Sequence, residues 1–225
     1  MSNLIFINYL LNQADKFYQK DHLMKEENLN QALFYVNRAL SLETFPSDGL
    51  LSKAYLLRGK INLSLQNYIE SILDLDKTLE IEEDHYLAFY YRAKAKKELS
   101  FFNDALKDFD NAIKLNSKNK DFFIARAFLK IKIKLFSEAI DDFDNAINID
   151  QNSTFLFFQK GIYEIELGNF GEAVKNFDIA LKKSLENNFD RGLIEIHRNF
   201  AEEKYIENIQ NLLNKNRLFK EYKKS

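Results

Sequence analysis

The segment NDALKDFDNAI, residues 103–113, returns 34 positions later as SEAIDDFDNAI, residues 137–147. Both copies carry two alanines seven positions apart with a phenylalanine between them, which in the first copy are Ala105, Phe109 and Ala112. Steps of four and three residues place these side chains on one face of a helix. Methyl-sized groups on that face would let a second helix approach closely, so the segment predicts one member of a tightly packed helix pair.

The same 34-residue step runs through four consecutive stretches of the chain. A small residue recurs at Gly59, Ala93, Ala127 and Gly161, and large apolar residues recur at Leu75, Phe109, Phe143 and Phe177 and at Tyr68, Phe102, Phe136 and Phe170. A fixed period of this length indicates a stacked array, in which each unit covers the apolar face of its neighbour. We therefore expect the recurring aromatic residues to form the core between layers.

This pattern resembles the tetratricopeptide repeat (TPR) family, whose unit is a pair of antiparallel helices with a small residue at position 8 and Ala, aromatic and Ala at positions 20, 24 and 27. With the small residue at position 8, the units begin at Ser52, Tyr86, Lys120 and Thr154. The resemblance implies an all-α fold, an α-solenoid in which stacked antiparallel helix pairs form a right-handed superhelix. The chain departs from the family where position 4 carries Tyr or Phe in place of Trp and where position 32 lacks Pro.

Three regions are expected along the chain. Residues 1–46 would form a degenerate first TPR-like helix pair and its link, with a first helix near residues 3–19 and an insertion near residues 44–49. Residues 52–185 would form four repeats, 52–85, 86–119, 120–153 and 154–185. Residues 186–225 would form C-terminal capping helices, as expected at the end of a repeat array. Within this last region Arg191 and Gly192 echo Arg58 and Gly59, but 31 residues after Gly161 rather than 34.

Composition narrows the class of partner. The chain has 225 residues, with Lys+Arg 32 against Asp+Glu 34 and a net charge of -2, so no overall charge favours nucleic acid or an anionic membrane. It contains no cysteine, which excludes disulfides, thiolate chemistry and Cys-ligated zinc. We expect a cytoplasmic protein, since a reducing compartment fits this composition.

The N-terminal apolar stretch from Leu4 to Leu11 is not expected to be a targeting signal. Asn8 interrupts it, no Lys or Arg precedes it, and apolar residues continue beyond it at helical spacing. No later run approaches the 18 apolar residues of a membrane span. A core-facing helix is the favoured interpretation.

Catalytic and metal-binding patterns are not found. His22, His85 and His197 lie far apart, with no pair at i and i+4 to present two ligands from one helix. The acidic residues around Asp142 lie in a predicted helix and lack the Gly and terminal Glu of a calcium loop. The sequence predicts a protein that is not an enzyme and that uses no cofactor or metal.

A ladder of charges keeps the 34-residue step. Position 7 carries Arg58, Arg92, Arg126 and Lys160, and position 25 carries Asp76, Asp110, Asp144 and Asp178. We expect these groups to pair between the two helices of a unit or between adjacent units. Structural ion pairs are favoured over ligand contacts.

Positions 2, 5, 9 and 12 of each first helix form one stripe, because they are spaced by three, four and three residues. In the TPR family this stripe lines the concave groove. The candidate groove residues here are Lys53, Leu56, Lys60, Tyr90, Lys94, Lys97, Ile124, Phe128, Ile131, Phe155, Phe158, Ile162 and Ile165. The stripe is basic at its start and apolar at its end, and an apolar surface of that kind is rarely left uncovered.

Two occupants of this groove remain open. The favoured interpretation is a non-enzymatic TPR adaptor or scaffold that binds a peptide or helix of a partner protein, acidic near the lysines and apolar near the phenylalanines. The alternative is a self-associating structural protein, possible as a homo-oligomer, whose groove is filled by its own C-terminal helix. That helix would contribute Ile206, Ile209, Leu212, Leu213 and Phe219.

One well-defined TPR ligand mode, the carboxylate clamp for chaperone tails, does not match. It requires Lys, Asn, Asn, Lys and Arg at five positions that here hold Leu56, Lys60, Tyr91, Asp121 and Ala125. Moving the register by one repeat does not restore the match. An Hsp70 or Hsp90 co-chaperone is therefore disfavoured.

Overall fold

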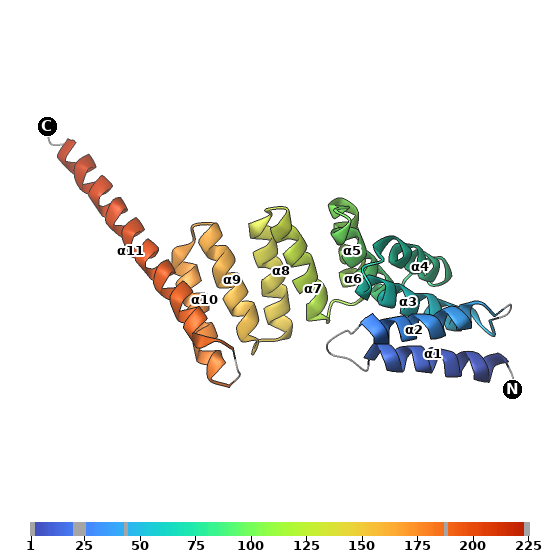
Figure 1. The fold of residues 1–225 in the computed structure, drawn as a ribbon. Coiled ribbons are helices and arrows are strands. Elements are labelled where there is room, and N and C mark those ends of the chain that lie inside the picture. The colour runs from blue at the N-terminus through green and yellow to red at the C-terminus, as the bar shows by residue number, and fades with distance from the viewer. Residues whose placement is uncertain (1–2, 20–25, 43–44, 187–188, 223–225) are drawn as a thin grey trace. The chain divides into compact units, whose positions relative to one another are not determined.

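The chain is built of α-helices (Figure 1). A computed structural model describes the backbone of residues 3–19, 26–42, 45–186 and 189–222, and the side chains of these residues except 186 and 216–222. Parts of the predicted link and insertion, residues 20–25 and 43–44, lie outside the described residues, as does His22. Over the described part, the secondary structure consists of helices joined by short turns, as the all-α solenoid predicted from the sequence requires. No helix in these ranges is long and apolar enough to cross a membrane.

The chain divides into two compact units, residues 1–125 and residues 126–225, and the division falls inside helix α7. Unit 1 contains the helices α1 (Asn3–Gln19), α2 (Glu26–Leu40), α3 (Asp48–Ser64), α4 (Tyr68–Ile81), α5 (Tyr86–Glu98), α6 (Phe102–Leu115) and the start of α7 (Lys120–Lys132). Its packed pairs are α1 with α2, α3 with α4, and α5 with α6. Helix α3 begins at Asp48, before the expected start of the first repeat at Ser52.

Unit 2 contains the rest of α7, then α8 (Phe136–Ile149), α9 (Thr154–Glu166), α10 (Phe170–Lys183), a short 3-10 helix η1 (Ser184–Glu186) and α11 (Arg191–Tyr222). Helices α9 and α10 pack as a pair, and α11 packs along α10. The region expected to form capping helices over residues 186–225 thus contains one long helix over its described part, α11.

The small residue at position 8 lets the two helices of a pair touch. A Cβ atom added to Gly59 of α3 would lie 2.8 Å from the Leu75 side chain of α4. A Cβ atom added to Gly161 of α9 would lie 2.6 Å from the Phe177 ring of α10. Both distances are too short for real contacts, so the predicted need for small residues holds at these two crossings.

The large residue opposite position 8 is the centre of each layer. Leu75, Phe109, Phe143 and Phe177 are fully buried, as are the flanking alanines Ala105, Ala112, Ala139 and Ala146. Phe102 and Phe136, also expected in the core, are only half-buried. Each of them is the first residue of its helix, beside the turn.

In each of the four repeats, the turn between the two helices contains a residue with positive φ, again in step with the 34-residue period. These residues are Gln66, Ser100, Lys134 and Gly168, with φ of 63, 64, 64 and 76°. After Lys134, the amide of Leu135 donates to the carbonyl of Lys130 at 2.8 Å, and the Lys134 amide donates to the carbonyl of Ile131 at 2.9 Å. These two hydrogen bonds define the Schellman motif, in which the residue with positive φ is usually glycine.

We expect Lys134→Gly to stabilise the fold and Gly168→Ala to destabilise it, each by about 1 kcal/mol, because a side chain at positive φ is strained and glycine is not. The measurement is the chemical denaturation midpoint of each variant. Equal midpoints for the parent and both variants would contradict the left-handed turn geometry.

The predicted charge ladder forms ion pairs between adjacent 34-residue repeats. Asp76 at position 25 accepts from Arg92 of the next unit at 2.6 Å, and Asp144 accepts from Lys160 at 2.5 Å. The ladder also uses buried aspartates at position 23 that sequence reasoning did not single out. Each forms an ion pair with the arginine at position 7 of its own repeat. These pairs are Arg58 with Asp74, Arg92 with Asp108 and Arg126 with Asp142.

Helix α11 occupies the place of the first helix of a fifth repeat. Arg198 pairs with Asp178 at 2.8 Å, as the position 7 cations do in earlier units. Arg198 follows Lys160 by 198−160 = 38 residues, four more than the period, so the register of this last unit is shifted by four. With Arg198 at position 7 of the shifted register, Ile194 and Ala201 fall at positions 3 and 10, and both are buried. The register therefore passes through Arg198, and the echo at Arg191 and Gly192 is not the repeat's continuation.

Candidate functional site

In unit 1, two helices bring aromatic rings to the lysine of the first repeat. Lys60 of α3 lies with its Nζ 4.8 Å from the ring centre of Tyr18 and 5.5 Å from that of Tyr91. Tyr18 comes from α1 and Tyr91 from α5. The ammonium group is thus held by cation–π contacts on two sides.

The lysine of the second repeat shares one of these rings. The Nζ of Lys94 lies 5.5 Å from the ring centre of Tyr90 and 5.9 Å from that of Tyr91. The Tyr90 ring packs against two further rings, with its centre 4.7 Å from that of Phe122 and 6.0 Å from that of Phe109. We call Lys60, Lys94 and the three tyrosines the lysine–tyrosine cluster.

The two lysines differ from the cations around them in having no carboxylate partner. Among the described residues, no carboxylate oxygen lies within the 4.0 Å of a salt bridge from Lys60 or Lys94. By contrast, Lys96 lies 2.7 Å from Asp108, and Lys97 lies 2.9 Å from Glu98. The cluster therefore presents two half-buried positive charges that the described chain does not neutralise by contact.

Burial changes the acidity of the cluster. Desolvation lowers the pKa of Lys60, against a smaller opposite effect of Asp15, and lowers the pKa of Lys94, where Lys97 acts in the same direction. Desolvation also raises the pKa of Tyr90 and of Tyr91 to about 12, so both phenols stay protonated at neutral pH. An anion beside the lysines would stabilise their charged form and raise their pKa again.

This arrangement can bind a carboxylate. Ammonium groups form their strongest hydrogen bonds with ionised acceptors. Both lysines are already partly desolvated in the folded chain, so a ligand has less water to displace from them. The tyrosine rings would hold the apolar part of the same ligand.

In unit 2 the candidate stripe is apolar. Phe128 of α7 is exposed by 36%, with its ring centre 5.9 Å from Phe143 and 6.3 Å from Phe155. Phe158 is buried instead, because the rings of Phe189 and His197 each lie 5.3 Å away. The segment that leads into α11 thus covers one of the predicted groove residues.

The apolar stripe continues onto α11, which sequence reasoning missed. In the shifted register, positions 2, 5 and 9 of α11 are Leu193, Ile196 and Phe200. All three are exposed, Ile196 by 67% and Phe200 by 46%. The signal in the sequence was the apolar spacing itself, hidden by the four extra residues before it.

The remaining candidates lie as follows. Lys53 is exposed, while Leu56, Ile124, Ile131, Phe155, Ile162 and Ile165 are half-buried. Ile162 and Ile165 pack against the core formed by Phe158, Phe177 and Ile194. Lys97 is the least suited to a ligand, because its charge is already paired with Glu98.

The C-terminal helix contacts the array through residues other than those expected. Ile194 and Ala201 are buried against α10, whereas Ile206, Ile209, Leu212 and Leu213 are exposed. The Phe219 side chain lies outside the described residues. The alternative interpretation, in which this helix fills its own groove, is therefore not confirmed.

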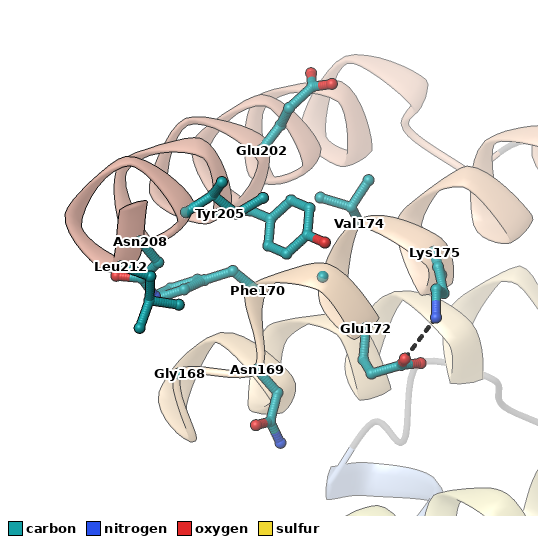
Figure 2. Close-up of a pocket in the computed structure, with 12 residues that line it drawn as sticks. Gly168, Asn169, Phe170, Glu172, Val174, Lys175, Glu202, Tyr205, Asn208 and Leu212 are labelled. Atoms are coloured by element: carbon teal, nitrogen blue, oxygen red, sulfur yellow. Dashed lines mark hydrogen bonds and ion pairs between the residues drawn. The ribbon is translucent and has the colours of Figure 1, made fainter. Parts of the chain in front are cut away.

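A cavity of about 620 Å³ lies between α11 and the turn that joins α9 to α10. Figure 2 shows the Tyr205 ring pointing from α11 toward Val174 of α10, with Phe170 and Leu212 on the same side. Acidic groups, Glu172 and Glu202, lie at its edge, and Glu172 accepts from Lys175 at 2.6 Å. No group of three or more His, Cys, Asp or Glu in the described ranges is placed to hold a metal ion.

No protein-family model and no curated protein matches the chain. Solved structures do match. The crystal structure of a tetratricopeptide repeat protein from Parabacteroides merdae ATCC 43184 superposes with a TM-score of 0.69 and 18% identity, over 96% of this chain and 80% of that one. The chain has a tetratricopeptide-repeat fold.

Two further solved structures superpose on this chain. The crystal structure of MamA has a TM-score of 0.66 and 19% identity, and covers 80% of this chain and 93% of that chain. The structure of YrrB, described as a TPR protein with an unusual peptide-binding site, has a TM-score of 0.62 and 19% identity, over 84% of this chain and 89% of that one. These superpositions support the TPR fold.

Proposed function

We propose that this TPR chain is a non-enzymatic adaptor that binds an acidic and apolar peptide segment of a partner protein, with its carboxylates at the lysine–tyrosine cluster. The observation that carries the proposal is the pair Lys60 and Lys94, half-buried on tyrosine rings without a carboxylate partner in the described chain. All other half-buried cations described above form an ion pair with an aspartate or glutamate. A cytoplasmic location remains a prediction from composition.

The surroundings of the cluster define the partner. Two ammonium groups favour one or two acidic side chains, and the faces of Tyr90 and Tyr91 favour apolar or aromatic residues next to them. In unit 2 the exposed Phe128, with Ile196 and Phe200, favours apolar residues only. The cluster in unit 1 therefore favours a segment in which acidic residues alternate with large apolar residues.

The test is the binding of a fluorescein-labelled peptide that alternates glutamate with leucine and phenylalanine, followed by anisotropy. We expect saturable binding by the parent and a loss of affinity of about tenfold or more in the double variant Lys60→Met and Lys94→Met. Methionine retains an apolar stem of similar length over the rings and removes only the charge.

The matched control is Lys114→Met with Lys118→Met, since both lysines are exposed in the same unit. This control should bind as the parent does, and circular dichroism should show equal helicity for all three proteins. Binding that survives in the cluster variant, or that is equally strong for a peptide with glutamine in place of glutamate, would reject the proposed site.

A further inference from the structure

The buried aspartate at position 23 binds a lysine in two of the repeats. In the second repeat, Asp108 binds Lys96 at position 11 in addition to its arginine, with 2.7 Å between the ammonium and the carboxylate. In the third repeat, the ammonium of Lys130, also at position 11, lies 2.9 Å from Asp142 and 3.7 Å from Glu138. The aspartate therefore holds an arginine and an ammonium group together in both repeats.

The first repeat lacks this lysine. Its position 11 is Asn62, which lies 130−62 = 68 residues, or two periods, before Lys130. The side-chain amide of Asn62 donates to Oδ2 of Asp74 at 3.1 Å, and Oδ2 is also the aspartate oxygen that the lysine contacts in the third repeat. Asn62 thus replaces a hydrogen bond of the lysine but not its charge. The fourth repeat needs no lysine here, because its position 23 is Asn176.

The carboxylate at position 19 of the first repeat is also without a cation. Glu70 is exposed and is the equivalent of Glu138 in the third repeat. Among the described residues, no ammonium or guanidinium group lies within 4.0 Å of the Glu70 carboxylate. By contrast, Asp104 and Glu172 at the same position each pair with a lysine three residues later, where the first repeat has Leu73.

A cavity of about 450 Å³ lies at this place, between α2, α3 and α4. The residues that line it include Asp74, Glu70 and Asn62, which are polar, and Leu33 and Leu73, which are apolar. Because an arginine already pairs with Asp74, the negative charge that remains without a partner is that of Glu70. A single cation on an aliphatic stem would complement both the charge and the leucines.

We propose that this cavity binds an alkylammonium group, the chemistry of a lysine side chain, in the place that Lys130 fills in the third repeat. The ammonium would lie between the carboxylates of Asp74 and Glu70, and its stem would pack on the two leucines. The arginine on Asp74 does not prevent this contact, since Asp108 accepts from Arg92 and Lys96 together.

The cavity is separate from the lysine–tyrosine cluster. Arg58 and Asn62 both line the cavity and are four residues apart, so they share one side of α3. Lys60 lies midway between them in sequence and therefore points to the other side of the helix. The cavity can hold a basic group independently of the acidic peptide proposed for the cluster.

The test is a titration of the full chain followed by NMR, with three probes. They are a lysine capped at both ends, the equally capped norleucine, whose stem ends in a methyl group, and cadaverine, a free diamine. The reporters are the side-chain amide of Asn67 and the backbone amide of Leu73, both at the cavity. We expect saturable shifts with capped lysine in the millimolar range and none with norleucine.

Two variants remove the site in different ways. Asn62→Lys should abolish the shifts, because the new ammonium would fill the cavity as Lys130 does in the third repeat. Glu70→Gln should weaken binding about threefold, the loss of one exposed ion pair. The matched control is Glu83→Gln, which removes an exposed carboxylate of the same unit and should bind as the parent does.

Equal shifts with capped lysine and norleucine would overturn the proposal, as would a parent that shows no shift. Parent-like binding by Asn62→Lys or by Glu70→Gln would also overturn it. Binding of capped lysine in preference to cadaverine would assign the cavity to a lysine of a partner protein. Binding of cadaverine at least as tightly would assign it to a free amine of the same chemistry.

Discussion

Replacing Phe143 with alanine is expected to destabilise unit 2 by about 3 to 5 kcal/mol. The Phe143 side chain is fully buried, and its ring lies 5.9 Å from Phe128 and 6.1 Å from Tyr163, so three helices lose packing at once. The measurement is the free energy of unfolding by chemical denaturation, followed by circular dichroism.

Phe136→Ala is the matched comparison, because it removes the same ring from the same helix at a half-buried position. Its expected cost is smaller, about 1 to 2 kcal/mol. Equal costs for the two variants would contradict the layer arrangement, in which position 24 is the centre of the core and position 17 is its edge.

Replacing Asp108 with alanine is expected to destabilise unit 1 by about 3 kcal/mol, since removing one member of a buried ion pair leaves the other uncompensated. The Asp108 carboxylate is 3% exposed and accepts from Arg92 at 2.7 and 2.8 Å and from Lys96 at 2.7 Å. Two cations would lose this partner at once. The measurement is again the free energy of unfolding.

Asp104→Ala on the same helix serves as the control. Asp104 is exposed and lies 3.4 Å from Lys107, a surface pair worth about 0.5 kcal/mol or less. If Asp108→Ala were as mild as this control, the position 23 aspartates would be surface charges rather than part of the structural ladder.

The repeat period predicted the fold because packing at a helix crossing depends on a few residues with a fixed spacing. Gly59 and Gly161 meet the large residue of the facing helix as the position 8 rule requires. Asp74, Asp108 and Asp142 recur with the same period at position 23. Their burial could not be predicted from the sequence, because aspartates also recur at position 25, two residues later. Only the packed helices distinguish the carboxylate that faces its own unit from the one that faces the next.

The candidate site was predicted in part. Lys60 and Lys94 follow from the stripe at position 9, whereas Tyr18 comes from α1, outside the 34-residue register and separated from it by the predicted link. The continuation of the stripe onto Leu193 and Ile196 was hidden by four extra residues that shift the register. The lowered lysine pKa values follow from burial by several helices, which spacing along one helix does not reveal.

Whether the lysine–tyrosine cluster selects acidic, apolar peptides is tested most directly by an unbiased peptide display selection. Random peptides are selected in parallel on the parent and on the Lys60→Met, Lys94→Met variant, and the enriched sequences are compared. We expect the parent to enrich Asp or Glu next to Phe, Tyr or Leu, and the variant to lose the acidic preference. Enrichment of basic or uncharged peptides on the parent, or the same acidic peptides on both proteins, would contradict this expectation.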